Sequence, residues 1–205
     1  MDHQHRRSSD RHRSGFSILE LLIVLAIFGI VVAISMPVGG AAVSSYKLSG
    51  QAHAIAYQVA LAKMRAAASF TRARVFIDLA NRTYRLEEWN KTTSLWTTDG
   101  GIEQLPRLID FSFGAATAPP PNTQGAIGQA AQCRVGVLAA SALVADSSCV
   151  TFNSRGVPID STGAPTGNDA VYLTDGTAVY ATTVSATGMT QLWWTPAQTL
   201  SWQKQ

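Results

Sequence analysis

The sequence predicts an α+β protein in which a long N-terminal helix packs on a β-rich head. Residues 16–36 form an almost wholly apolar run, and apolar side chains then repeat at helical spacing as far as Ala66. After Arg74 the apolar pattern changes to a period of two, which is typical of strands. We therefore expect four segments: a leader (1–15), an apolar span (16–36), an amphipathic continuation of the helix (37–69) and a head (70–205).

The apolar run is long enough to cross a bilayer. A helix rises about 1.5 Å per residue, so roughly 20 residues span the hydrocarbon core. Positive residues that flank such a span stay on the cytoplasmic side, and the leader carries Arg6, Arg7, Arg11 and Arg13. A secretory signal would have a shorter apolar core followed by its cleavage site. We therefore expect a retained single-pass anchor with the head on the outer side.

Glu20 is the only charged residue within this run. A carboxylate in hydrocarbon costs about 2.5–3.5 kcal/mol on insertion scales, so an anchor with no other purpose should lack one. The charge therefore indicates a partner group. A carboxylate tolerated near the lipid headgroups is the alternative.

The order Gly15, Phe16 and then Glu20 resembles the N-terminus of type IV pilins and type II secretion pseudopilins. The resemblance implies cleavage after Gly15 by a prepilin peptidase, N-methylation of Phe16 and polymerisation into a filament. It also implies a bacterial inner-membrane protein with a periplasmic head. Its partners would be the lipid bilayer, other pilin or pseudopilin subunits and the inner-membrane assembly platform. Pro37 lies where pilins carry a helix-kinking proline.

Such a filament gives Glu20 a specific role. Subunit helices leave the bilayer and pack side by side, so the new α-amine of Phe16 becomes a buried cation. The Glu20 carboxylate of a neighbouring subunit can neutralise it, although a pair within one helix competes. Breaking a buried pair of this kind costs about 3–5 kcal/mol, because one charge is left unpaired.

Beyond the span, one helical face is apolar and several strands follow. The apolar face holds Leu48, Ala52, Ile55, Val59, Ala62 and Ala66, and Lys63 and Arg65 point away from it. We interpret the cations Lys63, Arg65, Arg72 and Arg74 as a solvated helix end. We expect strands near 74–79, 83–89, 105–113, 150–153, 170–174, 177–184, 191–195 and 200–202, a hairpin turn at Asp175-Gly176 and a long loop over 115–132.

Cys133 and Cys149 lie in the part of the chain expected to face the periplasm. An oxidising compartment favours a disulfide between them, worth about 3 kcal/mol on the loop-entropy model. Two unpaired buried thiols are the alternative.

The segment Val150–Pro158 contains the pattern F-x-x-x-G-x-P and resembles the domain of pseudopilin H and minor pilin T. This resemblance implies a minor subunit that helps to initiate or cap a type IV pilus or a type II secretion pseudopilus. Some minor pilins of this group bind DNA for natural transformation through a Gly-Arg-x-Arg element. The corresponding stretch here, Gly188–Gln191, has neither arginine, which argues against DNA binding. A DNA-binding minor pilin is the alternative function, and an anchored domain that never polymerises is a third.

No residue pattern predicts an enzyme or a cofactor. His53 is the only histidine outside the leader, the leader histidines have no scaffold for a metal, and no nucleophile motif is present. Asp160, Asn168 and Asp169 could hold calcium, but their spacing matches no calcium-loop motif, so turn chemistry is the default interpretation. The net charge is +3, and removing the leader leaves about +1, too near neutral to indicate nucleic-acid binding.

Of Trp193 and Trp194, we expect one to face the core and the other solvent.

Overall fold

The computed structural model describes the backbone of residues 17–205 and the side chains of residues 17–33 and 43–205. Contacts divide the chain into two units, one ending at Ala42 and the other running from Val43 to Gln205. Helix α1 (Ile18–Ala68) contributes residues to both. The long helix that the sequence predicts is therefore confirmed over this range.

In the first unit, α1 begins after Ser17. The Ser17 side-chain oxygen accepts a hydrogen bond from the Leu19 amide at 3.3 Å, and its carbonyl accepts one from the Leu21 amide at 3.1 Å. Searched over the described residues, no helix is long and apolar enough to cross a membrane. Gly15, Phe16 and the side chain of Pro37 lie outside the described residues, so cleavage, methylation and the kink stay predictions.

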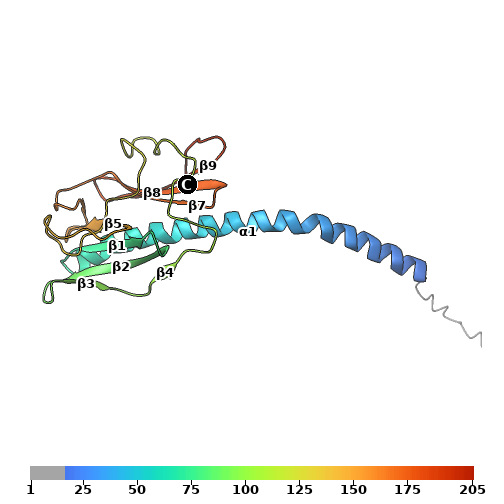
Figure 1. Cartoon of the computed structure of the whole chain (residues 1–205), viewed down its shortest axis with the longest axis horizontal. Helices are drawn as coiled ribbons and strands as arrows, with labels where there is room; N and C mark the ends of the chain where they lie inside the picture. The colour runs from blue at the N-terminus through green and yellow to red at the C-terminus, as the bar shows by residue number, and fades with distance from the viewer. Residues whose placement is uncertain (1–16) are drawn as a thin grey trace, which may run out of the picture. The chain divides into compact units, whose positions relative to one another are not determined.

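In the second unit, the amphipathic face of α1 forms one side of the core. The six apolar side chains at helical spacing are each at most 1 % exposed, as the sequence predicts. They form one cluster with inward-facing residues of two antiparallel sheets. Figure 1 shows the strands lying alongside this part of α1.

The first sheet has the strand order β3-β2-β1-β5-β6, with β4 paired to β2. In β1, Val75 and Ile77 face the core while Arg74 and Phe76 face the opposite side, because successive side chains alternate along a strand. The strands are β1 (Ala73–Asp78), β2 (Thr83–Asn90), β3 (Leu95–Thr98), β4 (Glu103–Gln104), β5 (Ser147–Phe152) and β6 (Pro158–Ile159).

The second sheet has the strand order β10-β9-β8-β7. The predicted hairpin at Asp175-Gly176 is confirmed: β7 and β8 pair antiparallel around it, and Gly176 adopts a φ of 85° that favours glycine. The strands are β7 (Asp169–Thr174), β8 (Ala178–Val184), β9 (Thr190–Pro196) and β10 (Gln203–Lys204).

The long connection between β4 and β5 covers the outer faces of both sheets. Phe113, Ala116 and Ile127 pack on the face of the second sheet that carries Tyr172 and Trp193. Further along, Cys133 and Val144 pack against Phe76 and Cys149 on the outer face of the first sheet. Residues 115–132 contain no strand, as expected. Part of this loop covers the apolar outer face of the second sheet.

Two predicted strands are wrong. In the segment 105–113, Leu105 and Ile109 are buried, but the Ile109 amide bonds the Pro106 carbonyl in a turn. Asp110 forms only an isolated bridge, to Thr174. The short strand β10 lies at 203–204 rather than at 200–202, where the Trp202 indole nitrogen instead donates to the Ala118 carbonyl at 2.9 Å.

Candidate functional site

The first part of α1 presents apolar side chains on all its sides. Twelve large apolar residues between Ile18 and Val32 are exposed, by 81 % at Ile18 and 39 % at Val32. A helix that is apolar all round is normally buried, either in a membrane or among other helices. An apolar surface of this kind therefore indicates a bilayer or other helices as its surroundings.

Glu20 lies in the first turn of this apolar helix. Its side chain is exposed, and no ion pair to it is present among the described residues. An acid in the first turn also suits the positive end of the helix dipole. The carboxylate is therefore accessible to a group beyond the described residues.

The F-x-x-x-G-x-P segment forms a tight junction with α1 and with the hairpin between β8 and β9. Gly156 has a φ of 73°, and a Cβ atom there would lie 3.2 Å from Lys63 Cγ. Gly188 has a φ of 71°, and a Cβ atom there would lie 2.8 Å from the Gly156 carbonyl oxygen. The Lys63 ammonium donates to the carbonyls of Thr187 at 3.2 Å and Gly188 at 3.0 Å. Glycine is therefore needed at both positions, because α1, the F-x-x-x-G-x-P segment and the hairpin between β8 and β9 approach each other closely there.

We expect Gly188→Ala to lower the free energy of unfolding by about 1–3 kcal/mol, because the methyl group meets backbone atoms at an unfavourable φ. Urea unfolding of the chain beginning at Val43 would measure this. Gly100→Ala is the matched control: Gly100 also has a positive φ (95°), but a Cβ atom there meets nothing within 4 Å. A loss at Gly188 no larger than that at Gly100 would contradict the junction.

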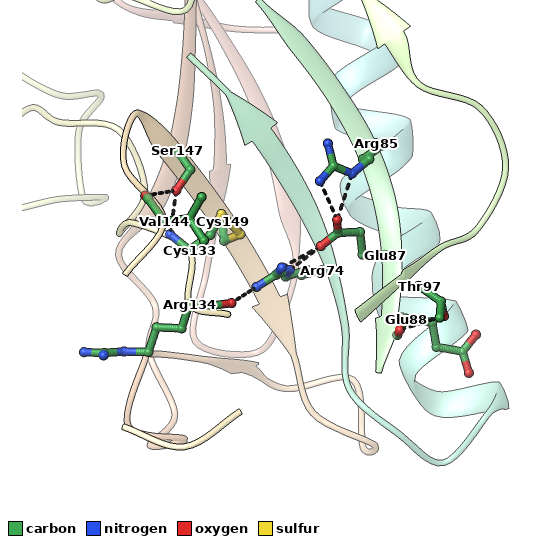
Figure 2. A network of polar contacts seen from close by, with 10 residues as sticks. All are labelled: Arg74, Arg85, Glu87, Glu88, Thr97, Cys133, Arg134, Val144, Ser147 and Cys149. Carbon is green, nitrogen blue, oxygen red and sulfur yellow. Dashed lines mark hydrogen bonds and ion pairs between the residues drawn. A yellow bond between two sulfur atoms is a disulfide. The ribbon is translucent and has the colours of Figure 1, made fainter. Parts of the chain in front are cut away.

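The outer face of the first sheet carries a buried charged network (Figure 2). The Oε2 atom of Glu87 lies 2.7 and 2.6 Å from two guanidinium nitrogens of Arg74, which donate to it. The Oε1 atom of Glu87 lies 2.7 Å from the guanidinium nitrogens of Arg85. Register explains this, because β1 and β2 place Arg74 directly opposite Glu87. Arg74 also donates to the Arg134 carbonyl at 2.7 Å, which joins the network to the connection that carries Cys133. Burial lowers the pKa of the Arg74 guanidinium, and the Glu87 carboxylate opposes that shift.

Aromatic rings complete the network. The Arg74 guanidinium carbon lies 4.0 Å from the Trp96 ring centroid, and that of Arg85 lies 4.0 Å from the Phe76 ring centroid. A disulfide joins Cys133 to Cys149 beside Phe76 and fastens the connection to β5. The interpretation of Lys63, Arg65, Arg72 and Arg74 as a solvated helix end holds for Arg65, which lies in the last turn of α1 with 48 % of its side chain exposed. It is wrong for Arg74, which is 4 % exposed, and Lys63 and Arg72 bond backbone carbonyls.

Sequence reasoning missed this network. The two predicted strands, 74–79 and 83–89, place Arg74 and Glu87 on neighbouring strands, but only the register of the structure sets them opposite each other. Glu87 and Glu88 face opposite sides of β2: Glu87 is buried, while Glu88 is half-buried and its backbone carbonyl accepts a hydrogen bond from the Thr97 hydroxyl (Figure 2).

The acidic residues near the loop before β7 comprise a turn-forming aspartate, Asp160, and a half-buried one, Asp169. Asp160 Oδ1 accepts three hydrogen bonds, from the Thr162 amide, the Thr162 hydroxyl and the Ala164 amide. The bond from the Thr162 hydroxyl is the main cause that lowers the pKa of Asp160 below its usual value. Burial, with a smaller contribution from Asp160, raises the pKa of Asp169 to about 6. Among the described residues no His, Cys, Asp and Glu group could hold a metal ion.

We expect the raised pKa of Asp169 to make the second unit less stable as the pH rises from about 4 to 6. The folded chain binds the proton more tightly than the unfolded chain, so this stabilisation is present below the unfolded pKa and is lost through the folded pKa. Asp169→Asn should remove the dependence and be more stable at pH 7.5 by about 1–2 kcal/mol. Urea unfolding at pH 4, 6 and 7.5 would measure these changes in stability, with the exposed Asp146→Asn as the control. Equal pH dependence in the wild type and in Asp169→Asn would contradict the prediction.

The remaining candidates are structural or exposed. Trp193 packs with the outer cluster of the second sheet and Trp194 with the main core, so the expectation that one of them faces solvent is wrong. The Trp193 indole nitrogen donates to the Thr183 hydroxyl at 3.1 Å. His53 is exposed on α1, as predicted.

Residues 10–36 match the family model described as the prokaryotic N-terminal methylation motif. The chain carries an N-terminal methylation motif. The match covers Arg11 and Arg13 of the leader, the residues Gly15 and Phe16, and the whole apolar span with Glu20. The methylation motif and the exposed apolar helix therefore coincide in the same segment.

Two solved structures of the minor pseudopilin EpsH from the type II secretion system of Vibrio cholerae are similar to this chain. The first has a TM-score of 0.43 at 12 % identity, and covers 71 % of this chain and 95 % of the other. The second has a TM-score of 0.42 at 12 % identity, and covers 71 % and 92 %. No curated protein matches the chain significantly.

Proposed function

We propose that this chain is a structural minor subunit, a pilin or pseudopilin, of a type IV pilus or a type II secretion pseudopilus. The methylation motif over residues 10–36 is the observation that carries the proposal. The apolar helix that surrounds Glu20 supports it, because such a surface suits both a bilayer and a bundle of identical helices.

In this proposal the chain is made with a cytoplasmic leader, residues 1–15. A prepilin peptidase cleaves after Gly15, and the new terminus at Phe16 is methylated. Residues 16–36 anchor the chain in the inner membrane, and the head lies in the periplasm. An oxidising compartment suits the Cys133–Cys149 disulfide.

Assembly would then transfer the apolar helix from lipid to protein. The Glu20 carboxylate would pair with the α-amine of Phe16 on a neighbouring subunit, so that neither charge is buried alone. Other pilin or pseudopilin subunits and the inner-membrane assembly platform are the partners.

DNA binding is not favoured by the hairpin between β8 and β9. Its turn, residues 185–189, contains no lysine or arginine, and Lys63 is the one cation among the described residues that is shown bonded to it. A phosphate chain would find few positive charges there.

Processing gives the sharpest genetic test of the proposal. We expect Gly15→Leu to leave the leader attached in cells with an active prepilin peptidase, because the bulky side chain stands directly at the scissile bond. Immunoblotting of membranes would show one longer band instead of the shortened product. Ser14→Ala, one residue earlier, serves as the control and should be shortened normally. Normal shortening of Gly15→Leu would refute the cleavage site.

A further inference from the structure

Phe70, just beyond the end of α1, is strained and exposed. Its φ is 50°, in the left-handed region, and it is 75 % exposed. The Thr71 amide bonds the Ala66 carbonyl at 3.2 Å, which closes the helix end around Phe70. Glycine or asparagine usually occupies this position, and other residues lose about 1–2 kcal/mol there. Within the described residues, no burial of the ring offsets this cost, so a function outside the fold is indicated.

Phe70 stands at the side of a groove of about 490 Å³. Trp89, Val137 and Ile159 supply apolar lining, and Arg72, Lys91 and Arg155 supply three positive charges. No carboxylate lines the groove. All of these residues belong to the second unit.

The three positive charges are not neutralised within the described chain. The Lys91 ammonium donates to the Phe70 carbonyl at 2.6 Å, and the Arg72 guanidinium donates to the Val137 carbonyl at 2.7 Å. Backbone carbonyls are uncharged, so these hydrogen bonds fix the Lys91 and Arg72 side chains without neutralising their positive charges. Arg155 is exposed, and its backbone amide, not its guanidinium, donates a hydrogen bond to the Asn153 side chain.

We infer that this groove docks an extended segment of a partner protein that carries carboxylates beside apolar side chains. A carboxylate complements Arg155 and its two neighbouring cations. An apolar side chain of the partner packs on the exposed Phe70 ring and takes it out of water. Aromatic residues and arginine are enriched at protein interfaces.

A nucleic acid fits this surface less well than an acidic peptide. Glu88 lines the adjoining hollow, which shares Thr71, Trp89 and Lys91 with the groove. A phosphate chain is charged at every nucleotide and would meet this carboxylate wherever it left the groove on this side, whereas a peptide can place an uncharged residue there. The net charge without the leader is also only about +1.

Selection of random peptides displayed on phage against the full chain in detergent tests the inference. We expect selected peptides to be enriched in Asp and Glu and to bind about tenfold more weakly to Arg155→Glu. Phe70→Gly should bind as weakly while being at least as stable as the wild type, because it relieves the strained φ. This combination separates docking from folding.

Two variants serve as matched controls. Arg107→Glu makes the same charge change at an exposed arginine that does not line the groove. Leu200→Gly relieves a φ of 46° at another bulky apolar residue. Both should bind the selected peptides like the wild type. The inference is overturned if no acidic peptides are selected, if the controls weaken binding equally, or if oligothymidylate binds more tightly than the peptides. Because peptide binding needs neither cleavage nor filaments, its failure is distinguishable from failure of the proposed function.

Discussion

Replacing Glu87 with alanine is expected to lower the free energy of unfolding of the second unit by about 3–5 kcal/mol. The substitution leaves the Arg74 guanidinium, 4 % exposed, without its carboxylate beneath the connection that carries Cys133. Arg85 is less affected, because 22 % of its side chain remains in contact with solvent. Urea unfolding of the chain beginning at Val43, at neutral pH, would measure the loss.

The neighbouring Glu88 provides the matched control for this prediction. Glu88→Ala removes the same group from the next position of β2, where the side chain forms no ion pair among those described. We expect it to change stability by less than about 0.5 kcal/mol. In addition, Arg74→Met combined with Glu87→Met should cost less than Glu87→Met alone, because no charge is then stranded. Equal effects of Glu87→Ala and Glu88→Ala would rule out a buried network.

Replacing Glu20 with alanine should leave processing and membrane insertion intact but reduce incorporation into filaments more than a hundredfold. Stranding the α-amine of Phe16 among apolar helices costs about 3–5 kcal/mol, and every 1.4 kcal/mol is a factor of ten. Filaments sheared from cells that express the complete set of subunits, probed by immunoblotting, would give the incorporated fraction.

Two further variants separate charge from packing at this position. Glu20→Gln keeps the shape and removes the charge, so it should fail like Glu20→Ala. Leu19→Ala removes an adjacent exposed apolar side chain and should still assemble. If Glu20→Ala joined filaments as readily as the wild type, the role assigned to the acid would be wrong.

Local patterns were enough to predict the helix and the paired strands of the head. The apolar spacing from Leu48 to Ala66 gave the buried face of α1, because a helix packed on a core needs one continuous apolar stripe. The Asp175-Gly176 turn likewise gave the β7–β8 hairpin, since its conformation is set by the turn residues themselves.

Long-range packing explains what the sequence did not predict. Leu105 and Ile109 are apolar enough for a strand, yet they are buried by a turn that includes Pro106. Arg74 looked like a surface cation, because the segment that covers it comes about sixty residues later, at Cys133 and Arg134. The strained φ of Phe70 depends on how α1 ends against the sheet and has no sequence signature of its own.

The intact mass of the wild-type chain extracted from membranes tests the central claim most directly. The account predicts a chain that begins at Phe16, carries one added methyl group and retains one disulfide. A mass corresponding to a chain that still begins at Met1 would contradict it.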